Sequence, residues 1–347
     1  MKNMRQNCVF LILFIVYLCF FHVVGYAETT KFTVSPVLPQ NQLNEASYFD
    51  LLVNKDTEQE IKIALRNTSS EELTVAADAR NSYTTSTGLI AYQKKATAED
   101  FSGVSFTRFV TTPHQIISLQ PYEERIISFM LSMKHTEFAG EILGAFLFEE
   151  VTASDQMTPT ESGTNLLSAY QYQIGIRMRQ SVQSLPKPEL SLIATSAVAH
   201  SGMPAIKSSI SNNQPVAFGQ ISVRSIIRKK NNDTIIGRFR ADNYQFAPHS
   251  VLELFTDFDQ QALEVGTYTT WVELTSKQGT WVFEDTVEID RQLRRSINEE
   301  TRYAATNRKE QVRYYVLLFI IIILMSIILW LVFARRKRAI DESEQIE

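Results

Sequence analysis

The sequence predicts an all-β protein: two immunoglobulin-like β-sandwiches in tandem, followed by one C-terminal transmembrane α-helix. Short segments rich in Val, Ile, Thr and Phe alternate apolar and polar residues, and Asn, Gly, Pro and Ser separate them. Pro186 and Pro188 interrupt this pattern near the middle of the chain, where two prolines favour an extended link over a strand. An uncharged apolar run over residues 314–333 is long enough to cross a bilayer as a helix.

The N-terminal residues 1–27 have the organisation of a secretory signal peptide. Lys2 and Arg5 precede an apolar run over Val9–Phe21, and the small residues Gly25 and Ala27 mark a cleavage site. The run is shorter than the roughly 20 residues that a spanning helix needs. We therefore expect cleavage after Ala27, with an uncleaved anchor as the alternative.

The proline link divides the predicted strands into a first sandwich over residues 28–184 and a second over residues 185–290. The first set of strands is Phe32–Pro39, Phe49–Asn54, Glu60–Asn67, Leu73–Ala79, Leu89–Gln93, Gln115–Leu119, Arg125–Met133, Glu141–Val151 and Tyr170–Arg179. The second set is Leu190–Ser196, Ala205–Ser211, Gly219–Arg228, Ile235–Ala241, Ser250–Thr256, Gly266–Leu274 and Thr280–Ile289. About seven strands in a hundred residues is the strand count of an immunoglobulin-like sandwich.

Two aromatic residues of the second sandwich receive structural roles. Tyr268 comes just after Gly266 at the start of the penultimate strand, which is the position of a tyrosine corner. The alternative is an ordinary half-buried strand tyrosine. Trp281 shares one face of its strand with Phe283 and Val287, so we expect its indole in the core.

Candidate partner-binding residues come from two places. The stretch Asn67–Gly140 is 73 positions long and its counterpart Asn212–Gly266 is 54, which leaves 19 extra residues within Asn81–Pro113. Long aromatic-bearing insertions on rigid sandwiches often carry binding residues. Trp271 points away from the predicted core, where it is either covered by the neighbouring domain or free to bind a partner. The candidates are Tyr83, Tyr92, Phe101, Phe106 and Trp271.

The C-terminal part predicts a charged stalk over residues 291–313, the transmembrane helix over 314–333 and a cytoplasmic tail over 334–347. Arg335–Arg338 supplies a basic cluster directly after the apolar run. We expect a single-pass protein of the cell membrane, with its ectodomain outside and its C-terminus in the cytoplasm. The basic excess of the stalk either keeps it soluble or contacts lipid phosphates or acidic wall polymers.

Composition argues against several function classes. The formal net charge of −4 gives no basis for nucleic-acid binding. Both cysteines, Cys8 and Cys19, lie in the predicted signal, so the mature chain has neither disulfides nor thiol chemistry. The sequence contains no HExxH, no GxSxG and no phosphate-binding glycine motif. We therefore expect no catalytic, metal or cofactor site.

An ordered set of motifs over about residues 32–300 resembles the WxL-interacting protein family. The matching segments are Phe32-x-Val34-x-Pro36, Pro39–Gln42, Tyr48–Leu51, Thr87–Tyr92, Phe138–Ala145, Tyr172–Ile176, Phe246–Ser250, Gly266–Tyr268 and Trp281–Phe283. The resemblance implies a Gram-positive surface protein with a peptidoglycan-binding domain followed by a host-binding domain. Its implied partners are WxL-domain surface proteins, peptidoglycan and host extracellular proteins.

The function hypothesis that follows is a non-catalytic, membrane-anchored cell-surface scaffold. An alternative is a chaperone-like assembly factor for surface proteins, which would complete a client's sheet with an exposed edge strand. A wall-modifying enzyme is a third hypothesis, and no residue pattern supports it.

Overall fold

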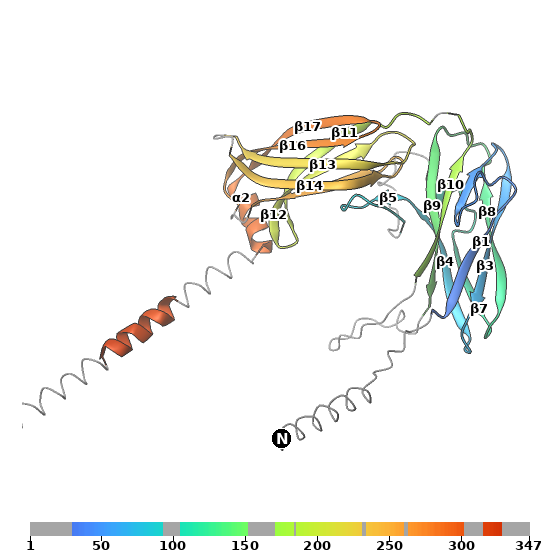
Figure 1. Ribbon diagram of the computed structural model, residues 1–347, viewed down its shortest axis with the longest axis horizontal. Helices are drawn as coiled ribbons and strands as arrows, with labels where there is room; N and C mark the ends of the chain where they lie inside the picture. The colour runs from blue at the N-terminus through green and yellow to red at the C-terminus, as the bar shows by residue number, and fades with distance from the viewer. Residues whose placement is uncertain are drawn as a thin grey trace, which may run out of the picture.

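The computed structural model describes residues 30–92, 105–151, 171–183, 185–230, 234–259, 263–301 and 315–327. The predicted signal peptide, the cytoplasmic tail and Phe101 lie outside these residues. Figure 1 shows two β-domains whose strands run crosswise to each other, with the hairpin strand β5 between them.

The first domain consists of a three-stranded and a five-stranded sheet packed face to face. The three-stranded sheet has the order β1 (Phe32–Val37), β3 (Glu58–Asn67), β8 (Glu124–Ser132). The five-stranded sheet has the order β2 (Phe49–Leu52), β10 (Gln171–Arg179), β9 (Glu141–Glu150), β4 (Leu73–Asn81), β7 (His114–Leu119). All neighbours are antiparallel except β2 and β10, which are parallel. Strand β10 therefore belongs to the first sandwich and precedes the proline link.

Phenylalanine rings fill the space between these two sheets. The ring of Phe146 lies 4.3 Å from that of Phe129 on the opposite sheet, 5.4 Å from Phe106 and 6.4 Å from Phe49, measured between ring centroids. All four side chains are fully buried or nearly so. Because no described residue of the mature chain is a cysteine, this packing has to hold the sheets together without disulfides.

The second domain is also a two-sheet sandwich. Its three-stranded sheet has the order β11 (Leu190–His200), β12 (Met203–Asn212), β15 (Val251–Asp257). Its four-stranded sheet has the order β14 (Ile235–Phe246), β13 (Phe218–Lys229), β16 (Gly266–Ser276), β17 (Gly279–Ile289). Apolar residues that alternate along these strands, among them Ile210, Leu254, Val223 and Val272, form the core between the sheets.

A buried asparagine occupies equivalent positions in the two sandwiches. Asn67 ends β3, and its Nδ2 donates to the carbonyl oxygens of Glu71 (2.7 Å) and Gln120 (3.0 Å). Asn212 ends β12, and its Nδ2 donates to Val216 (2.8 Å) and Ala247 (3.0 Å) in the same way. Each amide thus satisfies carbonyl groups of a loop that would otherwise be buried without partners. The same bonding pattern therefore recurs at the end of a strand in both sandwiches.

The segment that follows the second sandwich differs from the expected solvated stalk. Residues Arg291–Glu300 form helix α2, and Asp290 caps it by accepting a hydrogen bond from the Leu293 amide at 2.8 Å. Ile297 is buried, and Leu293 packs with it against the cluster that contains Ala197 of β11. The first part of the predicted stalk is therefore an amphipathic helix docked on the sandwich.

The predicted C-terminal transmembrane helix is wrong. Among the residues that the structure describes, no helix is long and apolar enough to cross a membrane. The described helix covers residues 315–327. The all-β architecture of the rest agrees with the prediction, and its immunoglobulin-like class stays a prediction.

Replacing Phe146 by alanine should destabilise the first sandwich by about 3–5 kcal/mol, because the cavity would adjoin three aromatic rings at once. Chemical denaturation of the full-length chain, followed by circular dichroism, measures the change. The matched control is Ile126→Ala on β8, where the side chain is 58% exposed and the expected change is within about 0.5 kcal/mol. Equal effects of the two substitutions would contradict the assignment of this core.

Candidate binding site at the junction of the sandwiches

One carboxylate joins the two sandwiches. Glu141 begins β9 and is almost completely buried. Its Oε1 accepts a hydrogen bond from the Ala217 amide at 2.5 Å, and its own amide donates to the Pro215 carbonyl at 2.8 Å. Both acceptor and donor belong to the segment between β12 and β13. A single residue of the first sandwich therefore holds a loop of the second by two hydrogen bonds.

A hairpin of the first sandwich makes the second connection. It consists of β5 (Tyr83–Thr84) and β6 (Ile90–Ala91), and Figure 1 shows β5 lying between the two sandwiches. The Thr84 hydroxyl lies 2.5 Å from the Ser250 hydroxyl and accepts from the Ala247 amide at 3.0 Å. The Gln245 amide donates to the Gly88 carbonyl at 2.7 Å. The hairpin thus bonds to the end of β14 and to the turn that follows it.

Glycine is required at the tip of this hairpin for two separate reasons. Gly88 has a φ of +73°, a conformation that L-residues rarely adopt. A Cβ at this position would also lie 2.2 Å from ring atoms of Tyr244 in the second sandwich. The absence of a side chain therefore lets the hairpin backbone rest directly on an aromatic ring. Burial raises the pKa of Tyr244 above its ordinary value.

Two arginines on β10 pair with buried carboxylates on the neighbouring strands. Arg177 pairs with Glu141 of β9, and Arg179 pairs with Asp50 of β2. Asp50 also accepts from the Asn44 amide group at 2.6 Å. Ile176 points into the core, so the arginines project from the outer face of the five-stranded sheet. Buried pairs of this kind are costly to break, because the remaining partner would be left charged and uncompensated.

Two tyrosines stand beside these ion pairs. Tyr48 is 38% exposed, and a Cβ at Gly175 of β10, two residues before Arg177, would lie 3.7 Å from the Tyr48 Cβ. Burial raises the pKa of Tyr92 above its ordinary value, and the neighbouring Glu141 carboxylate and Tyr48 phenol raise it further. We call this set the tyrosine face: Tyr48, Asp50, Tyr92, Glu141, Arg177 and Arg179.

The tyrosine face offers two kinds of contact to a ligand. The rings provide flat apolar surface with a polar hydroxyl at one end. The side chains of Arg177 and Arg179 are 29% and 16% exposed, and a guanidinium group can donate to carboxylate or carbonyl oxygen. In the described residues no group of three or more His, Cys, Asp or Glu is placed to hold a metal ion. The face is suited to noncovalent binding.

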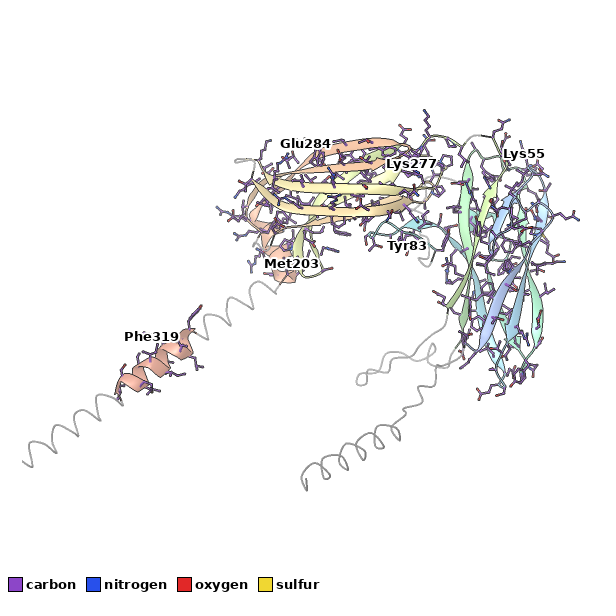
Figure 2. All side chains as sticks on the ribbon, viewed as in Figure 1. Lys55, Tyr83, Met203, Lys277, Glu284 and Phe319 are labelled. Atoms are coloured by element: carbon purple, nitrogen blue, oxygen red, sulfur yellow. The ribbon has the colours of Figure 1, made fainter. Side chains whose placement is uncertain are left out.

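The aromatic residues of the insertion that the sequence predicts as binding residues lie in different environments in the structure. Tyr83 is half-buried in the hairpin, and Figure 2 places it between the sandwiches. Tyr92 belongs to the tyrosine face. Phe106 is fully buried in the first core, with its ring 5.4 Å from that of Phe146, so its prediction as a partner-binding residue is wrong. Periodicity could not reveal this, because Phe106 lies in a short 3-10 helix (η1, Phe106–Phe109) rather than a strand.

The described parts of the insertion, residues 81–92 and 105–113, therefore have mainly structural roles. Phe109 and Val110 are buried with Phe106, and the hairpin holds the second sandwich. Sequence reasoning in turn missed Tyr48 and the two ion pairs. A signal was present: Arg177 and Arg179 alternate with core residues along a strand, but charged residues at such positions usually face solvent.

The aromatic residues of the second sandwich lie as follows. The Tyr268 hydroxyl donates to the Glu264 carbonyl at 2.9 Å, the bond back to the preceding backbone that defines a tyrosine corner. Trp281 is half-buried against the core, with its ring 5.5 Å from that of Phe218. Trp271 is half-buried on the outer face of the four-stranded sheet.

The fold and the tyrosine face define a tandem β-sandwich binding protein. Residues 32–150 match the peptidoglycan binding domain of WxL Interacting Protein, and residues 161–299 match its host binding domain. The chain belongs to the WxL Interacting Protein family. Strand β10 falls within the second matched region, although it is paired in the sheet of the first sandwich.

No curated protein matches the chain. Among solved structures, a chaperone–tip adhesin complex of CFA/I fimbriae is 12% identical, with a TM-score of 0.29, covering 75% of this chain and 100% of that one. The class 5 fimbriae chaperone CfaA is 13% identical, with a TM-score of 0.27 and coverage of 74% and 100%. The CupB2 chaperone of Pseudomonas aeruginosa is 14% identical, with a TM-score of 0.27 and coverage of 69% and 97%.

Replacing Gly88 by alanine should release the hairpin from the second sandwich. Gly202 is the matched control: its φ is +78°, but a Cβ there meets nothing within 4 Å. Both substitutions cost about 1–2 kcal/mol of backbone strain, and only Gly88→Ala also clashes with Tyr244.

Hydrogen exchange at the Gln245 and Ala247 amides, both of which donate to the hairpin, measures the difference. We expect faster exchange in Gly88→Ala and unchanged exchange in Gly202→Ala. Unchanged exchange in both variants would show that the hairpin does not hold the second sandwich.

Proposed function

We propose that this chain is a non-catalytic binding protein of the bacterial cell surface, with peptidoglycan bound at the tyrosine face. The observation that carries the proposal is the position of Tyr48 and Tyr92 beside two buried arginine–carboxylate pairs, in the sandwich that begins with the peptidoglycan-binding match. The second sandwich, which carries the host-binding match, binds protein partners. These partners are WxL-domain surface proteins and, in a host, extracellular host proteins.

The chemistry of peptidoglycan supports this assignment. Its sugar rings have apolar faces that stack on aromatic side chains, and its peptide stems carry carboxylates and amides. The Tyr48 ring supplies a partly exposed aromatic surface, and the guanidinium groups of Arg177 and Arg179 supply donors for stem carboxylates. Because both carboxylate partners are already in place, the arginine side chains are held in position before a ligand arrives.

The junction supports a scaffold in which both sandwiches are bound at once. Glu141 and the hairpin residue Thr84 fix the second sandwich beside the tyrosine face. A wall-bound first sandwich would therefore present the second in one orientation to a protein partner. The chaperone-like assembly factor remains a hypothesis from the sequence, and no observation in the described residues favours it.

The double substitution Tyr48→Ala, Tyr92→Ala should weaken retention of the full-length chain on purified wall sacculi by tenfold or more, equivalent to about 1.4 kcal/mol. Tyr48→Phe with Tyr92→Phe should retain binding, because the rings remain. The control is Tyr122→Ala, a tyrosine 62% exposed in the turn between β7 and β8, at the opposite edge of the sheet order from β2.

Sedimentation of the protein with sacculi at a series of concentrations gives the affinities. Circular dichroism should show that every variant is folded. Failure of the unsubstituted chain to cosediment would overturn peptidoglycan binding, and equal retention of all variants would place the wall-binding site elsewhere.

A further inference from the structure

The outer face of the four-stranded sheet in the second sandwich carries a continuous set of long side chains. Residues directly opposite each other on neighbouring strands share one face. Val223 of β13 and Val272 of β16 are buried. Because side chains alternate along a strand, the residues next to each of these valines point outward. Two adjacent rows cross all four strands: Arg238, Ile226, Trp271 and Glu284 in one, and Arg240, Arg224, Glu273 and Val282 in the next.

Positive charge is concentrated on the β13–β14 half of this face. Arg224 stands directly opposite Arg240, and Arg238 is two residues away on the same strand. Like charges placed directly opposite each other destabilise a sheet. All three side chains are exposed, and none takes part in an ion pair among the residues that the structure describes. The sheet thus places three arginines close together without an ion-pair partner among the described residues.

The β16–β17 half has the opposite charge. Glu273 stands beside Arg224, and Glu284 stands beside Trp271 on the edge strand. Trp271 occupies the middle of its row, next to Ile226, and forms an apolar centre between the two charged halves. Tryptophan and arginine are the residue types that most often dominate protein–protein binding energy. We call the five residues Arg224, Ile226, Arg238, Arg240 and Trp271 the arginine–tryptophan face.

We propose that the arginine–tryptophan face binds a polypeptide with an acidic segment, carboxylates contacting the arginines and an apolar side chain lying against Trp271. The inference rests on the proposed binding function of the second sandwich and names the chemistry of its partner. A uniform polyanion fits less well, because Glu273 and Glu284 would repel its continuation across the sheet. A polypeptide can place neutral or basic residues over these glutamates.

The probe is a synthetic peptide with a glutamate-rich half, a central phenylalanine and a lysine-rich half. The comparison probes are a scrambled peptide of the same composition and polyglutamate. Binding of the full-length chain is measured by fluorescence anisotropy at low and at physiological salt. The charge-segregated peptide should bind at least tenfold more tightly than either comparison probe, and more weakly as salt is raised.

The test variant is Arg224→Ser, Arg238→Ser, Arg240→Ser. Its matched control is Arg291→Ser, Arg294→Ser, Arg295→Ser, which removes the same charge from exposed positions on α2, where the helix docks near the other sheet. The test variant should lose tenfold or more in affinity for the peptide, and the control should lose less than twofold. Glu273→Lys with Glu284→Lys should shift the preference toward polyglutamate.

Three results would overturn the inference: no binding of the peptide by the unsubstituted chain, equal loss in the test and control variants, or tighter binding of polyglutamate than of the peptide. None of them bears on cosedimentation with wall sacculi, which tests the first sandwich. Failure there with success here would remove peptidoglycan binding and leave the arginine–tryptophan face intact.

Discussion

The buried carboxylate of Glu141 is the constraint on which the arrangement of the two sandwiches depends. Burying a carboxylate is unfavourable unless it is paired and hydrogen-bonded. Arg177 neutralises this one from within the first sandwich, and the Ala217 amide completes its hydrogen bonding from the second. The pairing of β9 with β10 and the docking of the second sandwich therefore satisfy the same group. The tyrosine face is adjacent to this point, so a ligand bound there would contact a rigid part of the molecule.

The sequence predicts an exported chain whose mature part has no cysteine, so its two sandwiches are stabilised without disulfides. In the first sandwich, Phe146 links rings from both sheets, and in each sandwich a buried asparagine, Asn67 or Asn212, ties a loop to the end of a strand. Hydrophobic packing supplies most of the stabilisation. The asparagines bond to backbone groups that would otherwise be buried without hydrogen-bond partners. The same asparagine hydrogen bonds occur in both sandwiches, which indicates that the two share one local architecture.

Much of this architecture could be predicted from the sequence, because strands such as β16 alternate strictly and Tyr268 has a recognisable position. The burial of side chains in the insertion could not be predicted, because nothing in its composition distinguishes a buried ring such as Phe106 from an exposed one. Glu141 was equally hidden, because its partners are distant in sequence. The apolar C-terminal run satisfied a length rule, but no helix among the described residues is long and apolar enough to cross a membrane.

Glu141 and the hairpin hold the two sandwiches together as one rigid unit. Double electron–electron resonance tests this directly, with Cys8 and Cys19 replaced by serine and nitroxide labels on cysteines introduced at the exposed positions Ser118 of β7 and Thr286 of β17. We expect a single narrow distance distribution in the full-length chain. A broad distribution, or several distances, would show that Glu141 and the hairpin do not fix the sandwiches relative to each other.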